Sequence, residues 1–517
     1  MKKLICFSTV LILIPVLLMI FSFKFNEPSG ANSAIYSNNE VTGKELALVY
    51  CKICHLFPEP ALLDKKTWTT SVLPNMGLRL GIKQKDKDPY ESLDSIDMEI
   101  VKRLNIYPET PLIMKEDWDK IVAYYKNEAP SVLPKPKTDA VENNSKMPFT
   151  PRYISIGDPG FPMVTMLGFN DYTKELYIGD FDNLYALNSS WELTGQWKLN
   201  SPATHIEFQK SQPPLVLTIG HFGPSDQNLG ILSVLYPSDD QSQNVYIDNL
   251  KRPVYFVTGD LNGDNKRDVV VCNFGNYQGK LSWFDDCDAQ KEHVLSLLPG
   301  ARNAVIKDLN HDGKPDVIAL MAQAYEKVSV FRNKGNNVFE EEPLIEFPPV
   351  YGVSYFELAD INNDGYDDIL VSNGDNWDLS AIDKPYHGFR IYLNDGKNKF
   401  RESFFFPMYG CSKVMTGDFD KDGDLDIVAI SFYAQLKNPG HSFVYLQNNG
   451  NLNFSKSYLP EAKDGKWLTM DVADINNDGF PDVLLGSFIY NINEMSKAIT
   501  ASGQTDFPQV LLLTQNP

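Results

Sequence analysis

A nine-residue acidic pattern that occurs five times constrains the fold more than any other feature of this chain. The pattern is D-x-N/D-x-D-G-x-x-D, and its starts lie 48 to 58 residues apart, with Asn265 in place of the glycine in the first copy. Repeats of this length are typical of propeller blades or of a solenoid. Positions 1, 3, 5 and 9 of the five copies are Asp260, Asn262, Asp264 and Asp268; Asp308, Asn310, Asp312 and Asp316; Asp360, Asn362, Asp364 and Asp368; Asp418, Asp420, Asp422 and Asp426; and Asp474, Asn476, Asp478 and Asp482.

Each acidic loop lies between two apolar runs, and further strand-like runs follow before the next loop. Residues 328–331, 390–393 and 443–446 occupy the same place in successive repeats and alternate with a period of two, which indicates β-strands. Four short strands in each repeat make one blade of a propeller.

Two repeats upstream of the first loop keep the strands and lack the acidic residues, near 169–170 and 206–208, so that seven blades are expected. The last repeat ends one strand short, after 510–513, and residues 149–156 have the pattern of the missing outer strand. We therefore predict an all-β seven-bladed propeller over residues 149–517 that the N-terminal strand closes, which leaves no free sheet edge.

The acidic loops carry the ligands that a hard cation needs. Side-chain oxygens at positions 1, 3, 5 and 9 and the carbonyl of position 7 can surround Ca²⁺, and a small residue at position 6 permits the left-handed turn. Oxygen-only ligands favour Ca²⁺ over Mg²⁺, while solvated Asx turns are the simpler alternative. Five Ca²⁺ ions would add ten positive charges to a net charge of -20, so we expect them to stabilise the loops.

These repeats resemble the FG-GAP/VCBS repeats of integrin-α-like seven-bladed propellers over residues 149–517. The resemblance implies Ca²⁺ in the acidic loops on one face and ligand binding by loops on the opposite face. The opposite-face loops, 274–279, 373–389 and 432–442, are rich in aromatic residues. They are candidates for binding a glycan, a peptide or a protein, and ordinary loop packing is the alternative for any single residue.

A second motif lies near the start of the chain, at Cys51-Lys52-Ile53-Cys54-His55. The spacing C-x-x-C-H is typical of covalent attachment of haem c, in which two thiols form thioether bonds and the histidine binds iron. A redox-active cysteine pair would need a βαβ context, and a zinc site would need a second ligand pair; neither is visible in the sequence.

Around this motif the chain resembles a small class I cytochrome c domain over residues 39–127. A helix is expected from Gly43 into the motif, and a closing helix over 114–127 carries an apolar stripe. The resemblance implies an all-α fold in which the first and last helices pack together at the haem. Met76 is the preferred sixth ligand, Met114 is the alternative, and Met98 or an open site is also compatible with the sequence.

The N-terminal segment 1–25 has two lysines followed by an apolar run from Leu4 to Phe23. A run of this length predicts an export signal, either an uncleaved membrane anchor or a cleaved signal peptide, and an extracytoplasmic location such as the periplasm or the cell surface. The net charge of -20 argues against a nucleic-acid partner.

Residues 128–148 contain several prolines and lysines and little hydrophobic periodicity, which predicts an extended linker. Cys272 and Cys287 flank a predicted hairpin whose register makes a disulfide between them improbable, and with Cys411 they are expected to be buried thiols.

Three functions are compatible with these features. The preferred one is an extracytoplasmic c-type cytochrome that carries electrons through one haem to a redox partner protein. The alternatives are an oxidoreductase with its substrate site on the propeller, and an adhesion or ligand-binding propeller with a sensory haem. No paired catalytic carboxylates, Ser/His/Asp pattern or nucleotide-binding glycine loop is visible, so the preferred function is electron transfer rather than substrate conversion.

Overall fold

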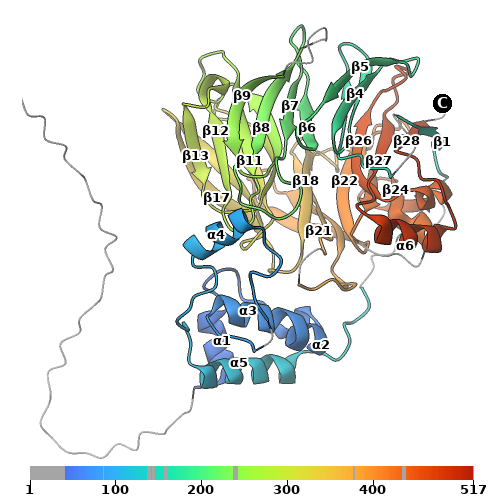
Figure 1. The fold of residues 1–517 in the computed structure, drawn as a ribbon. Helices are drawn as coiled ribbons and strands as arrows, with labels where there is room; N and C mark the ends of the chain where they lie inside the picture. Colours follow the sequence, from blue (N-terminus) through green and yellow to red (C-terminus); the bar gives the residue numbers. More distant parts are fainter. Residues whose placement is uncertain are drawn as a thin grey trace, which may run out of the picture. The chain divides into compact units, whose positions relative to one another are not determined.

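The computed structural model describes residues 41–85, 87–136, 141, 146–156, 161–236, 243–376, 379–433 and 438–515. The chain divides into two units, Met1–Val41 and Thr42–Pro517. The predicted export signal at 1–25 lies outside the described residues. Within those residues, the structure has no helix that is both long and apolar enough to cross a membrane. The second unit consists of a helical segment, residues 42–129, and a propeller, residues 149–515 (Figure 1).

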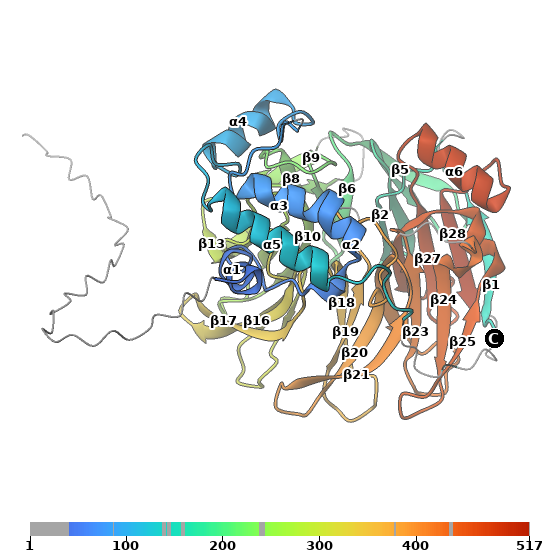
Figure 2. The same cartoon turned by 90° about the horizontal axis from the view of Figure 1, so that it is seen from below.

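The helical segment contains five α-helices and two short helices of other types. Leu46, Trp68, Trp118 and Tyr125 belong to its buried core, and Figure 2 shows the main helices gathered around it. The helices are α1 (Gly43–Tyr50), η1 (Pro60–Leu62), α2 (Lys65–Thr67), the π-helix η2 (Trp68–Val72), α3 (Leu73–Arg79), α4 (Ser95–Arg103) and α5 (Lys115–Glu128).

The first helix begins as the sequence predicts. The Thr42 side chain accepts a hydrogen bond from the Glu45 backbone N–H, and the Glu45 carboxylate accepts one from the Thr42 backbone N–H, which is a complete capping box. Helix α1 packs against α5. Gly43 allows the close approach, because a Cβ at this position would lie 2.1 Å from the Lys120 carbonyl oxygen.

The propeller has seven blades, each a four-stranded antiparallel sheet (Figure 1), which confirms the predicted architecture. In order along the chain, the strands are β1 (Phe149–Ile154); β2 (Met166–Asn170), β3 (Glu175–Gly179), β4 (Asn183–Leu187) and β5 (Leu193–Lys198) in blade 1; β6 (Ala203–Glu207), β7 (Leu215–Thr218), β8 (Gly230–Leu235) and β9 (Gln243–Leu250) in blade 2; β10 (Pro253–Gly259), β11 (Asp268–Asn273), β12 (Lys280–Phe284) and β13 (Glu292–Ser296) in blade 3; β14 (Ala301–Lys307), β15 (Asp316–Met321), β16 (Lys327–Gly335) and β17 (Val338–Glu346) in blade 4; β18 (Val353–Ala359), β19 (Asp368–Asn373), β20 (Gly388–Asn394) and β21 (Phe400–Pro407) in blade 5; β22 (Cys411–Gly417), β23 (Asp426–Ser431), β24 (Phe443–Asn448) and β25 (Phe454–Tyr458) in blade 6; and β26 (Trp467–Ala473), β27 (Asp482–Ser487) and β28 (Val510–Gln515) in blade 7.

The ring closes as the sequence predicts. Strand β1 pairs antiparallel with β28, from Phe149 opposite Gln515 to Ile154 opposite Val510, and supplies the fourth strand of blade 7. Neighbouring blades bury apolar side chains between them, and the second strands of blades 3 to 7 are buried along their whole length. The closed ring thus has no free strand edge at the junction of its two ends.

Some short helices interrupt the blades. The longest, α6 (Ile492–Ser502), lies between β27 and β28 and was not predicted from the sequence. The others are η3 (Asp285–Cys287), η4 (Pro439–Ser442) and η5 (Pro460–Asp464).

The predicted linker is held by other parts of the chain at the places that the structure describes. The Lys65 backbone N–H donates to the Pro130 carbonyl oxygen at 2.7 Å. Further along, Val141 packs against the core of blades 5 and 6, and Met147 packs against the core of blades 6 and 7. These contacts fix both ends of the segment, so it is not a free tether.

Candidate haem site and candidate calcium loops

The C-x-x-C-H motif begins at the C-terminal end of α1, where Cys51 is the last, capping residue. Cys51 is half-buried against the core of the helical segment, whereas Cys54 is exposed, and both are free thiols. Burial raises the pKa of the Cys51 thiol to about 11. Burial thus favours the neutral thiol of Cys51 over the thiolate.

The orientation of His55 suits an iron ligand. Its ring atom Nδ1 lies 2.7 Å from the Leu56 carbonyl oxygen. A carbonyl can only accept, so Nδ1 carries the proton and Nε2 presents its lone pair, which is the tautomer that metal-binding histidines use. Burial lowers the pKa of His55 and the nearby Arg79 lowers it further, while the hydrogen bond to Leu56 opposes this shift. The motif residues therefore fit haem c.

The methionines considered as the sixth ligand differ in their surroundings. Met76 lies in α3 and packs against the core that includes Trp68 and Leu73. Met114 precedes α5 and is 69% exposed. Met98 lies in α4, where the Lys102 ammonium is 3.3 Å from its sulfur. The packing of Met76 is compatible with the predicted role, which stays a prediction.

The acidic loops connect the first and second strands of blades 3 to 7 and fold in the same way. In the loop at Asp360, its carboxylate accepts hydrogen bonds from the backbone N–H groups of Asp364 and Gly365, at 2.9 and 2.7 Å. The side chain of Asn362 accepts a further bond from Asp364 at 3.1 Å. These bonds draw the side chains of positions 1, 3 and 5 toward the same centre.

The residue at position 6 has a left-handed backbone in all five loops, as predicted. Gly313, Gly365, Gly423 and Gly479 have φ between 83° and 95°, and Asn265 has φ of 63°. Asparagine tolerates this conformation better than most residues, which explains the one departure from glycine.

The aspartate at position 9 has a structural role that the sequence did not indicate. Asp368 is fully buried, and its two carboxylate oxygens accept backbone N–H groups of Ile361 and Asn394, at 3.2 and 2.8 Å. It thereby joins the acidic loop to the third strand of the blade. Asp268, Asp316 and Asp482 make the corresponding pairs of bonds, and Asp426 bonds to the Asn448 N–H and the Tyr445 hydroxyl.

The loop at Asp418 fits a cation most clearly. Oxygens of Asp418, Asp420 and Asp422 lie within 4.8 Å of one another. Asp418 Oδ1 is buried and has no hydrogen-bond partner, although a buried carboxylate oxygen needs one. Burial, with a smaller contribution from the carboxylates of Asp420 and Asp422, raises the pKa of Asp426 to about 7. A divalent cation in this loop would give Asp418 Oδ1 a partner and would neutralise the repulsion between the carboxylates.

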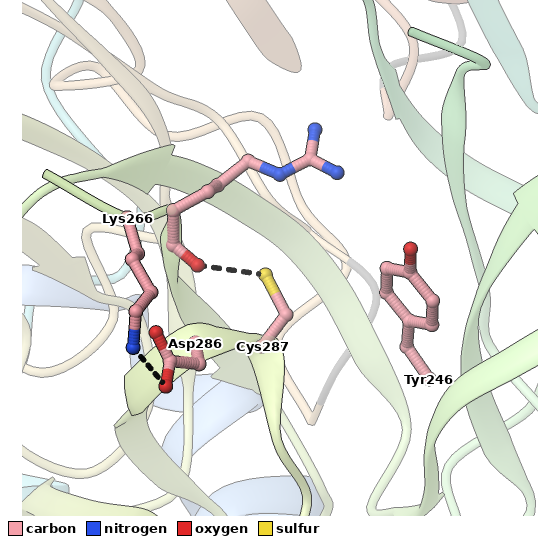
Figure 3. Close-up of a pocket in the computed structure, with 5 residues that line it drawn as sticks. Tyr246, Lys266, Asp286 and Cys287 are labelled. Atoms are coloured by element: carbon pink, nitrogen blue, oxygen red, sulfur yellow. Dashed lines mark hydrogen bonds and ion pairs between the residues drawn. The ribbon is translucent and has the colours of Figure 1, made fainter.

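A second acidic group joins Asp264 of the first loop to Asp285 and Asp286. Of these three residues, Asp286 lines a shallow pocket (Figure 3). Here the charge is compensated by protein groups, because Lys266 and Lys291 form ion pairs with Asp286. The Cys287 thiol in the same pocket donates to the Arg267 carbonyl oxygen at 3.2 Å. These ion pairs compensate part of the charge of the group, and Asp264 remains a candidate Ca²⁺ ligand at position 5 of the first loop.

The aromatic loops on the face opposite the acidic loops contact the helical segment. The Tyr386 hydroxyl donates to the Leu62 carbonyl oxygen at 2.9 Å, and Ser71 donates to the Leu379 carbonyl oxygen at 2.6 Å. The Tyr277 hydroxyl lies 3.1 Å from that of Tyr107. Two of the loops predicted to bind an external ligand thus hold the helices of the same chain.

Two charged residues reinforce this contact. Asp97 in α4 is buried and accepts hydrogen bonds from Ser225 and from the backbone N–H of Asp226, at 3.0 and 3.1 Å. The Arg79 guanidinium lies 5.1 Å from the centre of the Tyr277 ring.

Comparison with known proteins supports the propeller. The family model described as an FG-GAP-like repeat matches residues 260–319, 308–371 and 430–485. Integrin alpha-8 of Gallus gallus is 26% identical over 158 residues, which are 26% of this chain and 15% of integrin alpha-8. The chain thus matches about one seventh of the length of that relative.

Several solved structures match this chain at low sequence identity and with TM-scores below 0.5. The Pan2 WD40 domain of Neurospora crassa is 10% identical with a TM-score of 0.42, and covers 72% of this chain and 98% of its own. The N-terminal domain of Nup159 is 14% identical with a TM-score of 0.41, covering 74% and 99%. BBS1N in complex with ARL6DN is 9% identical with a TM-score of 0.43, covering 72% and 98%.

Proposed function

We propose that this chain is an extracytoplasmic c-type cytochrome that carries electrons through one haem c, with a Ca²⁺-stabilised propeller as its docking platform. The observation that carries the proposal is that the motif has two free thiols and a histidine whose Nε2 is free to bind a metal. Cys51 and Cys54 are free, and His55 Nδ1 is bound to the Leu56 carbonyl, which leaves Nε2 for iron. When bound, haem c supplies reversible one-electron chemistry at its iron.

The residues of the chain have distinct tasks in this proposal. Cys51 and Cys54 would hold the haem, His55 would bind the iron, and Met76 is the proposed ligand on the other side. The helical segment excludes water from one side of the motif through its buried core. The redox partner is proposed to be a protein, and the FG-GAP-like repeats together with the predicted export signal at 1–25 support an extracytoplasmic location.

The propeller is proposed to bind up to five Ca²⁺ through positions 1, 3, 5 and 9 of the acidic loops. The unpaired Asp418 Oδ1 and the convergence of positions 1, 3 and 5 support this proposal. A docking role is supported by the match to FG-GAP-like repeats, and the platform also holds the helical segment of the same chain.

The experiment is expression of the full chain in a host that attaches haem c, followed by spectroscopy of the reduced and oxidised protein. We expect the pigment to remain with the chain after denaturation and extraction with acidified organic solvent. Met76→Ala should remove the methionine-to-iron charge-transfer band and lower the reduction potential, whereas Met114→Ala should change neither. Colourless protein from the haem-attaching host would refute the proposal, and an unchanged band in Met76→Ala would remove Met76 from the site.

A further inference from the structure

Two arginines lie at the end of the central channel, on the propeller face that holds the helices. Arg252 precedes β10 in blade 3, and Arg302 lies at the start of β14 in blade 4. The two guanidinium carbons are 5.3 and 5.8 Å from the centre of the same ring, that of Phe274. We call Arg252, Arg302, Phe222, Phe274 and Tyr433 the mouth cluster.

The contacts of the mouth cluster join blades that are not neighbours. Arg302 of blade 4 donates to the Tyr433 hydroxyl of blade 6 at 3.4 Å. The ring of Phe222 in blade 2 stacks on that of Phe488 in blade 7, with centroids 5.0 Å apart. Residues of non-adjacent blades can meet in this way only where the blades converge, at the channel axis. The cluster therefore surrounds the mouth of the channel.

Arg302 is placed there by a local feature of its strand. The register of β14 and β15 shifts between Ala301 and Asn303, so Arg302 is the extra residue of a β-bulge. Bulges re-aim side chains and are common beside functional sites. The same shift occurs in the first strands of five other blades, where the extra residues are Thr204, Val254, Ser354, Ser412 and Leu468. Only blade 4 has a charged residue at this position among the six.

Arg252 is held in an uncommon backbone conformation, with φ of 43°. Its guanidinium donates to the carbonyl oxygens of Gly275 and Phe222, at 3.1 and 3.4 Å, while its Nε is buried and has no hydrogen-bond partner. A non-glycine residue in this conformation is strained, and such strain clusters at binding sites. An unpaired buried donor is unfavourable until an acceptor reaches it.

Neither arginine forms an ion pair within the described residues. Arg332 and Arg390, which are also largely buried, pair with carboxylates of their own or the neighbouring strand. The carboxylates of Asp226 and Asp375 attract the Arg252 guanidinium only through longer-range electrostatics. The Asp226 carboxylate accepts hydrogen bonds from the backbone N–H groups of residues 276–278. Burial lowers the pKa of Arg252 to about 10, yet both arginines keep part of their surface accessible.

We propose that the mouth cluster binds a small organic carboxylate with an aromatic or other flat apolar body. The two guanidinium groups would receive the carboxylate, because arginine binds carboxylates through paired, charge-assisted hydrogen bonds. The rings of Phe222, Phe274 and Tyr433 would receive the apolar body. Tyr490, which extends the ring cluster beyond Phe222 and Phe488, is 47% exposed and connects it to solvent. The proposal does not depend on haem.

The test is calorimetric titration of the full Ca²⁺-loaded chain with benzoate and, as neutral and inorganic comparators, with benzamide and inorganic phosphate. We expect benzoate to bind, and benzamide and phosphate to bind at least about tenfold more weakly. Arg302→Gln should weaken benzoate binding by about tenfold or more, with Arg302→Lys between it and the native chain. Arg401→Gln, at an exposed position of β21, is the matched control and should leave binding unchanged.

Binding of benzoate, benzamide and phosphate to the native chain tests the proposal even if a variant does not fold. Equal affinity for benzoate and benzamide would show that the guanidinium groups do not select an anion, and equal affinity for phosphate would show a general anion site. Absence of benzoate binding, or binding that folded Arg302→Gln retains in full, would also overturn the proposal.

Discussion

The propeller repeats one acidic loop five times, whereas the helical segment carries its C-x-x-C-H motif once. In the propeller, each loop builds the same local structure from its own residues, such as the bonds of Asp368 to Ile361 and Asn394. The helical segment depends on contacts between distant residues, such as that of Gly43 with Lys120. Because of this repetition, the fold of the propeller can be predicted from local sequence patterns. The helical segment is recognised mainly from the chemistry of one motif.

This difference predicts that removal of Ca²⁺ has the largest effect and that the effect is confined to the propeller. After chelation, the acidic loops of blades 3 to 7 would keep their carboxylates without a counterion. We expect amide hydrogen exchange in these loops to rise by at least about tenfold, because loss of a ligand lowers the local opening free energy. Blades 1 and 2, which lack the acidic loops, and the helical segment are the internal controls. Equal acceleration along the whole chain would contradict the prediction.

Asp368→Ala and Asp364→Ala separate the two kinds of aspartate in one loop. Loss of Asp368 leaves the buried N–H groups of Ile361 and Asn394 without an acceptor, so we expect unfolding free energy to fall by about 3 kcal/mol. This loss should appear in urea titrations with and without Ca²⁺. Asp364 is exposed, and its replacement should destabilise the chain only when Ca²⁺ is present. The same Ca²⁺ dependence for both variants would show that position 9 acts through the metal alone.

Glu326 connects the two regions. Its carboxylate accepts hydrogen bonds from the backbone N–H groups of Val350 and Val353, and Val350 packs on the core of the helical segment. Burial raises its pKa to about 7. The folded chain thus binds the proton more tightly than the unfolded chain, and the stability from this group is present below about pH 4.5 and lost as the pH rises to about 7. We expect this loss to be roughly 3 kcal/mol.

Glu326→Gln should flatten the fall in unfolding free energy between pH 5 and pH 8, as measured by urea titration at each pH. Glu346→Gln, at an exposed position of β17, is the control. An identical pH dependence in the native chain and Glu326→Gln would contradict the assignment.

Gly43→Ala tests the long-range packing of the helical segment. The added Cβ would meet the Lys120 carbonyl oxygen, so α1 and α5 must move apart, and we expect a destabilisation of about 2 kcal/mol. Hydrogen exchange in residues 43–50 and 115–128 should report it, while the propeller stays unchanged. Lys44→Ala alters the adjacent exposed residue and should have no such effect. Unchanged exchange in both helices would indicate that they do not pack as described.

Tyr386→Phe should have the smallest effect, since it removes one hydrogen bond between the propeller and the helical segment. We expect a loss of about 1 kcal/mol in the contact between the two regions, which faster proteolysis within residues 130–148 would report. Tyr366→Phe, at an exposed tyrosine of an acidic loop, is the control. Equal proteolysis of the two variants would mean that the Tyr386 hydroxyl does not hold the helices.

Much of the propeller could be predicted from the sequence, because each blade repeats the same periodic signals. The closing strand at Phe149 and the left-handed Asn265 follow from these local patterns, and the structure confirms both. Helix α6 was missed because it buries none of its residues and therefore leaves no apolar pattern tied to a core. The role of Asp368 was missed because a buried aspartate and a metal ligand look alike in sequence.

The placement of the helical segment could not be predicted, since it depends on pairs such as Asp97 with Ser225 that are 128 residues apart. Such pairs leave no periodic signal in a single sequence. The same reason hides the mouth cluster, in which Arg302 and Tyr433 are joined only by the closure of the ring. The haem ligands Cys51, Cys54 and His55 were identified by spacing alone, and their role stays a prediction.

The proposed covalent bond between haem and the helical segment is tested most directly by the intact mass of the denatured chain after treatment with a thiol-alkylating reagent. We predict the mass of the chain plus one haem, with Cys51 and Cys54 protected. Cys272, Cys287 and Cys411 should be alkylated, and so should Cys6 when segment 1–25 is retained. Cys51→Ala with Cys54→Ala should remove the added mass, and Cys287→Ser should retain it. A native chain without added mass, alkylated at Cys51 and Cys54, would contradict the assignment of this protein as a c-type cytochrome.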